Sequence, residues 1–184
     1  MNWEFTFLDW IQQTLRCTFL DWIMPIISLF GDGGVFWIIV TLGLLICKRT
    51  RRYGVVSAIA LILCLCVGNM LLKPLFARIR PFDVQSSVEL LVTAPKDYSF
   101  PSGHTQAAFA VAVSLCIWKK RVGIPVLLFA CLIAFSRMYL YVHYPTDILG
   151  GMISGTLFAF AGNIIANNFI YGEKQQPGKE LKAS

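Results

Sequence analysis

Long apolar stretches constrain this chain more than any other feature of its sequence. Residues 53–72, 122–141 and 146–171 are each near or above the length that crosses a bilayer, about 20 helical residues at about 1.5 Å per residue. Shorter apolar stretches at 34–47 and 102–118 are further candidate spans. Hydrophobic residues make up 57% of the 184 residues and charged residues only 14%, which excludes an ordinary soluble domain. The sequence therefore predicts an all-α, polytopic membrane helical bundle.

The two ends of the chain differ from these stretches. Residues 1–33 mix aromatic and acidic side chains, as an amphipathic segment lying in the membrane interface does. This gives five transmembrane helices, or six if residues 17–30 also cross. Residues 172–184 are polar and form a tail. We expect a single membrane-embedded domain over residues 1–171, followed by that tail.

The positions of the basic residues explain the net charge of +6. Residues 48–52 (KRTRR), residues 118–121 (WKKR) and the lysines of the tail each follow an apolar stretch. Alternate loops are therefore basic, which is the positive-inside pattern of membrane proteins, and the charge needs no nucleic acid partner. We expect a multi-pass protein of the cell membrane with these loops and the C-terminus in the cytoplasm. The 73–101 loop and the 137–146 turn then share the extracytoplasmic face.

The first cluster of charged residues on that face is KPLFARIRP, residues 73–81. Pro74 should end the preceding helix at Lys73, and Arg80 comes directly before Pro81, so both cations lie at a rigid exit from the membrane. Arg78 lies between them. Cationic anchors are usual on the cytoplasmic side, so their presence on the outer side favours a functional role.

The second cluster is PSGH, residues 101–104, at the start of the next span. Ser102 is a natural N-cap, and Gly103 lets the backbone approach a ligand closely. Free amide hydrogens and the positive end of the helix dipole favour an anion at this point. His104 follows directly, beside the expected anion site.

The third cluster is SRMYLYVHYPTD, residues 136–147, which contains Arg137, His143 and Asp147. Pro145 suits the first turn of the last span, and this places Asp147 just inside that helix. A carboxylate four residues after His143 can accept the imidazole Nδ1–H and fix its tautomer. The Nε2 atom is then free to attack or to accept a proton.

The balance of charge in these clusters predicts a phosphate ligand. The clusters supply three cations, Lys73, Arg80 and Arg137, together with the positive end of a helix, but only one dedicated carboxylate. This surplus of positive charge suits a phosphate dianion or a pyrophosphate. A zinc site built from His104, His143 and Asp147 is conceivable by ligand count, but the neighbouring cations would repel the metal, so we expect no metal and no other cofactor. One imidazole would attack phosphorus and the other would protonate the leaving oxygen; the pairing with Asp147 favours His143 as the attacking one.

Together the three clusters resemble the signatures of the type-2 phosphatidic acid phosphatase family, whose active-site pattern is shared with vanadium-dependent haloperoxidases. The family signatures are a lysine, six residues and Arg-Pro; Pro-Ser-Gly-His; and Ser-Arg, five residues, His, three residues and Asp. The chain carries all three in order, as Lys73 with Arg80 and Pro81, as Pro101–Ser102–Gly103–His104, and as Ser136, Arg137, His143 and Asp147. The resemblance covers residues 73–151 by motif and most of 34–171 by helix arrangement.

The resemblance implies a role for each of these residues. It implies that His143 forms a phosphohistidine, that Asp147 orients it, and that His104 is the general acid and later the base for water. The implied phosphate-binding residues are Lys73, Arg80, Ser102, Gly103 and Arg137. No divalent metal is implied.

For the substrate, the resemblance implies a lipid phosphate in the bilayer. Undecaprenyl pyrophosphate is the expectation, because the site faces outward and the short loops leave little room for a large headgroup; phosphatidylglycerol phosphate and phosphatidic acid are the alternatives. A non-catalytic phosphate or lipid transporter is the alternative from another class, but transport would predict ionisable groups near the bilayer midplane and needs no His–Asp pair. A haloperoxidase-like oxidant enzyme is disfavoured by the membrane-bundle fold.

Overall fold

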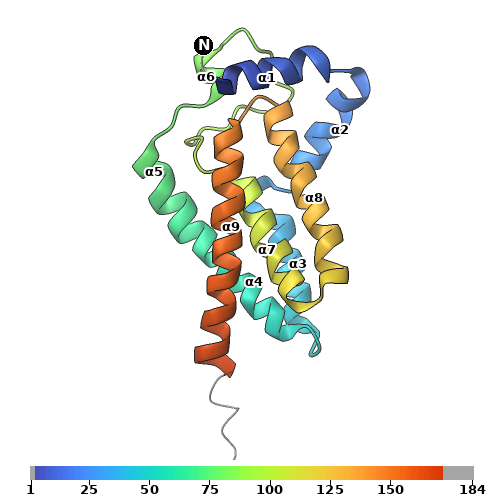
Figure 1. The fold of residues 1–184 in the computed structure, drawn as a ribbon, viewed down its shortest axis with the longest axis vertical. Helices are drawn as coiled ribbons and strands as arrows, with labels where there is room; N and C mark the ends of the chain where they lie inside the picture. The colour runs from blue at the N-terminus through green and yellow to red at the C-terminus, as the bar shows by residue number, and fades with distance from the viewer. Residues whose placement is uncertain (1–2, 172–184) are drawn as a thin grey trace, which may run out of the picture.

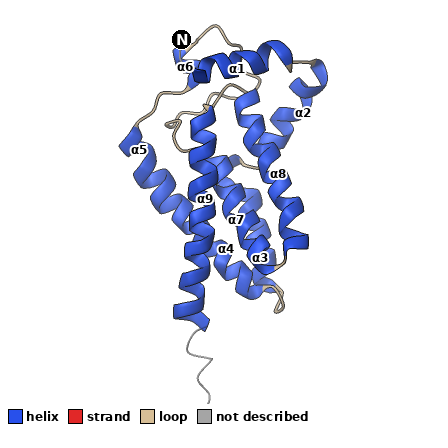
Figure 2. Cartoon of the chain, in the orientation of Figure 1, coloured by secondary structure: helices blue, strands red, loops and turns tan. Residues whose placement is uncertain are grey.

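The structure is a computed structural model that describes residues 3–171, and the predicted polar tail at 172–184 lies outside the described residues. Helices make up the described chain, with loops and no strands between residues 3 and 171 (Figure 2). In chain order they are α1 (Trp3–Thr14), α2 (Thr18–Leu29), the 3-10 turn η1 (Asp32–Gly34), α3 (Val35–Ile46), α4 (Arg51–Leu63), the π-helix η2 (Cys64–Leu72), α5 (Lys73–Phe76), α6 (Pro81–Val84), α7 (Gly103–Trp118), α8 (Lys120–Tyr139), α9 (Pro145–Ile165) and the π-helix η3 (Ala166–Tyr171). This confirms the predicted all-α bundle.

Within residues 3–171, four helical runs are long and apolar enough to cross a membrane: Thr18–Ile46, Arg51–Val84, Lys120–Tyr139 and Pro145–Ile170. The apolar helix Gly103–Trp118 is shorter. The predicted spans thus correspond to α3, to α4 with η2, to α7, to α8, and to α9 with η3. The first run also includes α2, which precedes α3 across the glycine turn at η1, where Gly33 and Gly34 adopt positive φ values of 57° and 69°.

Helix α7 forms the centre of the bundle and packs against α9, α8 and α4 (Figure 1). Its small and apolar side chains, from Ala107 to Ala112, are buried on every side of the helix. A helix that is apolar all round is stable only when neighbours cover it. The start of α7, which carries Gly103 and His104, is therefore fixed in depth relative to the surrounding helices.

Two glycines of α9 bring this helix into close contact with α7. A Cβ atom at Gly151 would lie 2.8 Å from the carbonyl oxygen of Ser102, and one at Gly155 would lie 2.4 Å from that of Gln106. Small residues spaced four apart allow this approach of two backbones. The contact joins the start of α9, with Asp147, to the start of α7, where the backbone amide of Ser102 donates to the carbonyl oxygen of Asp147 at 3.1 Å.

The helix before the first charged cluster does not end at Lys73, contrary to the sequence prediction. It continues as α5 to Phe76 and ends at Ala77, which adopts a left-handed conformation with a φ of 41°. Proline is tolerated in the first turn of a helical segment, and the hydrogen-bonding pattern changes from π to α at this point. Lys73 consequently points from within a helix, while Arg78 and Arg80 follow the turn.

Helix α1 lies across the end of the bundle at which α8 ends and α9 begins (Figure 1). Leu8 and Ile11 are buried beneath it, whereas Trp3 and Trp10 are exposed by 59% and 50%. The predicted amphipathic segment therefore consists of two helices, α1 and α2, separated around Cys17. The basic connections at 47–50 and around Lys119 lie at the opposite end of the bundle.

Candidate active site

The side chains predicted from the three clusters gather at the end of the bundle near α1. A cavity of about 650 Å³ is lined by Lys73, Arg80, Gly103, His104, Arg137 and His143, together with Asp32, Asp97, part of α2 and residues 90–95. Ser102 and Asp147 are fully buried, outside the lining of this cavity. Segments far apart in the sequence thus meet around one space that carries a cluster of cations.

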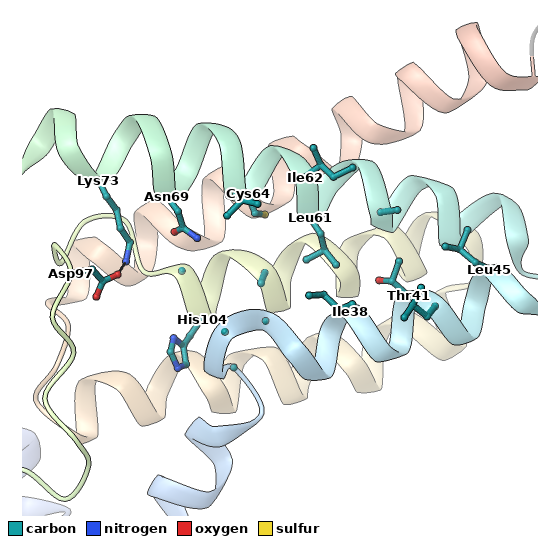
Figure 3. A pocket seen from close by; sticks show the side chains of 18 residues that line it. Ile38, Thr41, Leu45, Leu61, Ile62, Cys64, Asn69, Lys73, Asp97 and His104 are labelled. Carbon is teal, nitrogen blue, oxygen red and sulfur yellow. Dashed lines mark hydrogen bonds and ion pairs between the residues drawn. The ribbon is translucent and has the colours of Figure 1, made fainter.

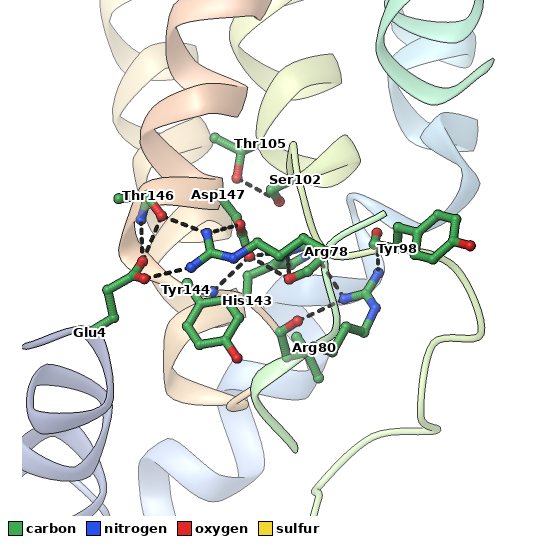
Figure 4. Close-up of polar contacts among 12 residues, drawn as sticks. Glu4, Arg78, Arg80, Tyr98, Ser102, Thr105, His143, Tyr144, Thr146 and Asp147 are labelled. Carbon is green, nitrogen blue, oxygen red and sulfur yellow. Dashed lines mark hydrogen bonds and ion pairs between the residues drawn. The ribbon is translucent and has the colours of Figure 1, made fainter. Parts of the chain in front are cut away.

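His143 and Asp147 form the pair that their spacing predicts (Figure 4). The Nδ1 atom of His143 lies 3.4 Å from Oδ2 of Asp147, and the hydroxyl of Ser99 lies 3.5 Å from the same Nδ1. The Asp147 Oδ2 also accepts hydrogen bonds from the Ser99 hydroxyl and, at 2.9 Å, from the backbone amide of Tyr144. This arrangement holds Nδ1 on the carboxylate side and leaves Nε2 on the side of Arg80.

The surroundings of His143 favour its neutral form. Burial is the largest cause that lowers its pKa well below the ordinary 6.5, and the positive charges of Arg80, Arg137 and Lys73 add to the effect. A neutral imidazole with a free Nε2 is a nucleophile, whereas an imidazolium is not. The cations that would bind a phosphate therefore also keep His143 reactive.

Arg80 is almost fully buried, with an exposed fraction of 3%, and several acceptors hold its guanidinium in place. Its Nη1 donates to the carbonyl oxygen of Val142 at 2.7 Å and lies 3.3 Å from Nε2 of His143. Its Nε and Nη2 donate to the carbonyl oxygen of Asp97 at 2.8 Å and to its Oδ1 at 2.7 Å. A guanidinium fixed so close to the imidazole suits an oxygen of a phosphoryl group bonded to Nε2.

Asp97 occupies the position between two of the predicted phosphate-binding cations. Its carboxylate pairs with the ammonium group of Lys73 and with the guanidinium of Arg80. Partial burial opposes ionisation of Asp97, but hydrogen bonding and attraction to Lys73, followed by Arg80, lower its pKa to about 2. Asp97 is therefore an anion where the sequence predicts that a substrate anion binds.

His104 lies across the cavity with a carboxylate partner of its own. Its Nε2 is 2.6 Å from Oδ1 of Asp32, which belongs to the glycine turn between α2 and α3. A Cβ atom at Gly31 would meet the His104 ring at 2.4 Å, so the turn packs directly on the imidazole. Asp32 thus contacts Nε2 of His104, whereas Asp147 contacts Nδ1 of His143, so the two carboxylates hold opposite ring nitrogens of the two histidines.

The remaining predicted phosphate-binding residues are Arg137, Ser102 and Gly103, which lie in or next to the cationic cavity. The Nη1 of Arg137 donates to the Ser28 hydroxyl of α2, while its buried Nε has no hydrogen-bond partner among residues 3–171. Ser102 is at the N-cap position of α7, but its hydroxyl makes no capping bond, which differs from the expectation. It accepts instead from the Thr105 hydroxyl at 3.1 Å, and its part in phosphate binding stays a prediction. A Cβ atom at Gly103 would lie 4.0 Å from Nζ of Lys73, so the first amides of α7 lie near that cation.

A second cavity, largely apolar and of about 470 Å³, leads away from the cations between α3 and the run from α4 to η2 (Figure 3). Ile38, Leu45, Leu61 and Ile62 form its apolar part. Lys73, Asp97, Gly103 and His104 line both cavities. A molecule with a charged head and a long apolar chain would fit these two adjoining cavities, with its head in the cationic one and its chain in the apolar one.

Sequence reasoning alone missed several residues that act on the predicted ones. Asp32, Ser28 and Ser99 contact His104, Arg137 and Asp147 from segments outside the three clusters. Asp32 stands in a GDGG turn that looks like a simple chain break, and its acidic side chain was the available signal. Between residues 3 and 171, no three His, Cys, Asp or Glu side chains are grouped to hold a metal ion.

Comparisons with known proteins identify the family of the chain. A profile of the PAP2 superfamily matches residues 35–171. The chain is 36% identical over 142 residues to a protein from Sulfolobus acidocaldarius named undecaprenyl-diphosphatase, covering 75% of this chain and 66% of that protein, just under two thirds of its length.

Two solved structures share the fold. One is the crystal structure of Aquifex aeolicus LpxE, with a TM-score of 0.76 and 27% identity over 88% of this chain and 95% of that one. The other is the crystal structure of a transmembrane PAP2-type phosphatidylglycerolphosphate phosphatase from Bacillus subtilis, with a TM-score of 0.71 and 26% identity over 97% of this chain and 90% of that one. The similarity thus extends over nearly the whole helical arrangement.

Proposed function

The chain belongs to the PAP2 superfamily, and from this premise we propose that it is an integral membrane lipid phosphatase that works through a phosphohistidine intermediate. The observation that carries the proposal is the position of His143. Its Nδ1 faces Asp147 and its Nε2 faces Arg80, in a cavity lined with Lys73 and Arg137. A buried, neutral imidazole aimed at an anion site is built for attack on phosphorus.

The reaction proceeds in two displacements. Nε2 of His143 attacks the phosphorus atom, the bond from phosphorus to the lipid oxygen breaks, and His104 gives its proton to that departing oxygen. Water then attacks the phosphohistidine and loses a proton to His104, and the electron pair of the P–N bond returns to Nε2. Arg80, Lys73, Arg137 and the first amides of α7 stabilise the charge on the phosphoryl oxygens, a task that requires no metal.

The apolar cavity supports a lipid as the substrate. Lys73 and His104 stand where the cationic and the apolar cavities share their walls, so the scissile phosphate lies at the boundary between them. The first segment of a chain attached to that phosphate then runs between α3 and α4. Longer tails extend into the bilayer, because the cavity lies between helices that meet lipid.

Among lipids, we favour undecaprenyl diphosphate. The relative from Sulfolobus acidocaldarius bears that activity in its name, and three cations suit a diphosphate better than a monoester. Phosphatidylglycerol phosphate is the second candidate, on the strength of the named activity of the Bacillus subtilis structure. Phosphatidic acid is the third.

We place the site on the extracytoplasmic face of the cell membrane. The basic connections at 47–50 and around Lys119 lie at the end of the bundle opposite the active site, and basic loops remain in the cytoplasm. The described chain ends with α9 and the π-helix η3 at that same end, so we propose a cytoplasmic C-terminus.

The test is phosphate release by the detergent-purified protein in excess EDTA, with undecaprenyl diphosphate, phosphatidylglycerol phosphate and phosphatidic acid offered in parallel. We expect release from at least one lipid and a loss of about 1000-fold or more in kcat for His143→Ala. Thermal unfolding of the variant shows whether it is folded. No release from any lipid, or full activity of the folded variant, would favour a non-catalytic lipid-binding or transport protein instead.

A further inference from the structure

Arg78 connects the carboxylate of Asp147 to the N-terminal helix, although it occupies one of the unspecified positions of the first signature motif (Figure 4). Its Nη1 donates to Oδ1 of Asp147 and to the Thr146 hydroxyl, both at 2.6 Å. Its Nη2 pairs with the carboxylate of Glu4, on α1. One guanidinium therefore spans two carboxylates that are 143 positions apart in the sequence.

Glu4 is tied to the start of α9 by bonds of its own. Its Oε1 accepts from the Thr146 hydroxyl at 2.6 Å and from the Thr146 amide at 3.3 Å. Only 5% of Glu4 is exposed, which is unusual for a carboxylate on an amphipathic helix. The ring of Tyr144 packs beneath the Arg78 guanidinium, with 3.9 Å from Cζ to the ring centroid, and Phe5 meets this ring edge-on.

The two oxygens of Asp147 therefore have separate partners. Oδ2 contacts Nδ1 of His143 and accepts hydrogen bonds from the Ser99 hydroxyl and the Tyr144 amide. Oδ1 accepts a hydrogen bond from Arg78. A carboxylate bound at both oxygens cannot rotate, so the orientation of the His143 ring depends on both sides. The charge of Arg78 also compensates a carboxylate that is wholly buried.

We propose that Arg78 is a positioning residue for His143, that it acts through Asp147, and that Glu4 holds Arg78 in place, which makes α1 part of the catalytic unit. This inference rests on the proposed phosphatase function of the same site. Arg78 does not line the cationic cavity, so its effect belongs to the chemical step rather than to phosphate binding.

The kinetic test uses Arg78→Gln, Arg78→Lys, Glu4→Gln and the double variant Glu4→Gln/Arg78→Gln, assayed with undecaprenyl diphosphate or whichever lipid of the panel is turned over. We expect kcat to fall about 10- to 100-fold in Arg78→Gln, the range typical of residues that orient a functional histidine, with KM within about twofold. Arg78→Lys should recover part of kcat, because an ammonium keeps the charge but cannot span both carboxylates. The double variant should lose less than the product of the two single losses.

Asp9→Asn is the matched control. Asp9 also lies on α1, and its carboxylate accepts from the Tyr141 hydroxyl at 2.7 Å, but it has no bond in the Arg78 network. The Asp9→Asn substitution removes one carboxylate that holds α1 on the bundle, while Glu4 and Arg78 stay in place. We expect a change in thermal stability comparable to that of Glu4→Gln, with kcat within about twofold of the unmodified protein.

A second readout needs no turnover. The chain contains two histidines, so nitrogen-15 NMR of the histidine-labelled protein resolves His143 once His104→Gln has assigned the other. We expect one His143 tautomer, with the proton on Nδ1, in the unmodified protein and in Asp9→Asn. A mixture of tautomers is expected in Arg78→Gln.

The outcomes separate the inference from the function on which it rests. A folded wild type that turns over no lipid contradicts the proposed function, and the NMR comparison still tests the positioning of His143. The inference is wrong if Arg78→Gln keeps kcat within twofold, or if Asp9→Asn loses as much kcat as Glu4→Gln. It is also wrong if the His143 tautomer is the same in every variant.

Discussion

His143 is buried among cations, and this sets the pH at which it can act. The imidazole attacks only when neutral, and burial with Arg80, Arg137 and Lys73 lowers its pKa well below 6.5. As the pH falls, activity is therefore retained through 6.5 and lost only at the lower, folded-state pKa. The lowered pKa makes the imidazole of His143 a weaker base, but it keeps the ring neutral, and so able to attack, at neutral pH.

The expected pH dependence follows from that direction. The acidic limb of kcat/KM, once the ionisation of the substrate phosphate has been divided out, should lie below pH 6.5. Steady-state rates from pH 4.5 to 8, in buffers of constant ionic strength, measure it. An acidic limb at or above 6.5 would mean that His143 is not shielded from water as the structure describes.

Not every residue of the site could be predicted from sequence in the same way. A fixed spacing of four residues, across the turn that leads into α9, related His143 to Asp147, and three short motifs related the cations to each other. Asp32 and Glu4 reach the site from segments joined to it only through the tertiary fold, and nothing local distinguishes their carboxylates from those of an interfacial helix or a turn. Contacts of that kind depend on how the helices pack, which a single sequence does not specify.

Among the elements, the loop between α6 and α7 has the most direct effect on the site. Through Asp97 it places a carboxylate on Lys73 and Arg80, so an incoming phosphate must displace that carboxylate or bind beside it. The side chain of Asp97 is 55% exposed, although those of Lys73 and Arg80 are buried, so water reaches each ion pair from the carboxylate side and the carboxylate is replaceable.

Asp97→Asn should therefore strengthen anion binding. We expect Ki for orthovanadate to fall about two- to fivefold, because an ion pair that water screens from the carboxylate side contributes about 0.2–1 kcal/mol. Glu89→Gln, which removes an exposed carboxylate from the same loop, is the control for the change in net charge and should leave Ki unchanged. A weaker inhibition in Asp97→Asn would instead identify Asp97 as a residue that orients the cations for substrate.

The contact between α7 and α9 determines how the two histidines face each other. Gly155→Ala adds a Cβ atom where 2.4 Å separates it from the Gln106 carbonyl oxygen, so the helices must move apart. We expect a loss of about 1–3 kcal/mol in stability, measured by unfolding in detergent, together with reduced activity. Gly43→Ala in α3 is the matched control, since its Cβ atom meets nothing within 4 Å. Equal stability of the two variants would refute the close contact.

The molecule as a whole has an active-site end and a basic end, and this polarity makes its orientation measurable. Cys17, between α1 and α2, and Cys47, after α3, are both exposed. These two connections lie at opposite ends of the bundle. In single-cysteine variants, a membrane-impermeant maleimide added to intact cells should label Cys17 and spare Cys47. Permeabilised cells supply the control, in which both are labelled. The reverse pattern would place the active site in the cytoplasm.

The helical arrangement was more predictable than the ends of its helices. Apolar length alone located α8 and α9, because the bilayer sets a minimum span. It could not reveal that the helix at Lys73 continues through Pro74, since the π-helical turn that precedes it depends on packing. Nor could it reveal that residues 3–30 divide into α1, which lies over the active-site end, and α2.

The most direct test of the account is to trap the phosphorylated enzyme. Protein in EDTA is mixed with lipid diphosphate carrying radiolabel in the terminal phosphate, quenched in alkali, in which phosphohistidine survives, and mapped to a peptide. We expect label on His143, no label in His143→Ala, and a longer-lived label in His104→Gln, because the base for the attacking water is missing. Phosphate release by the unmodified protein without label on His143, or label that persists in His143→Ala, would contradict it.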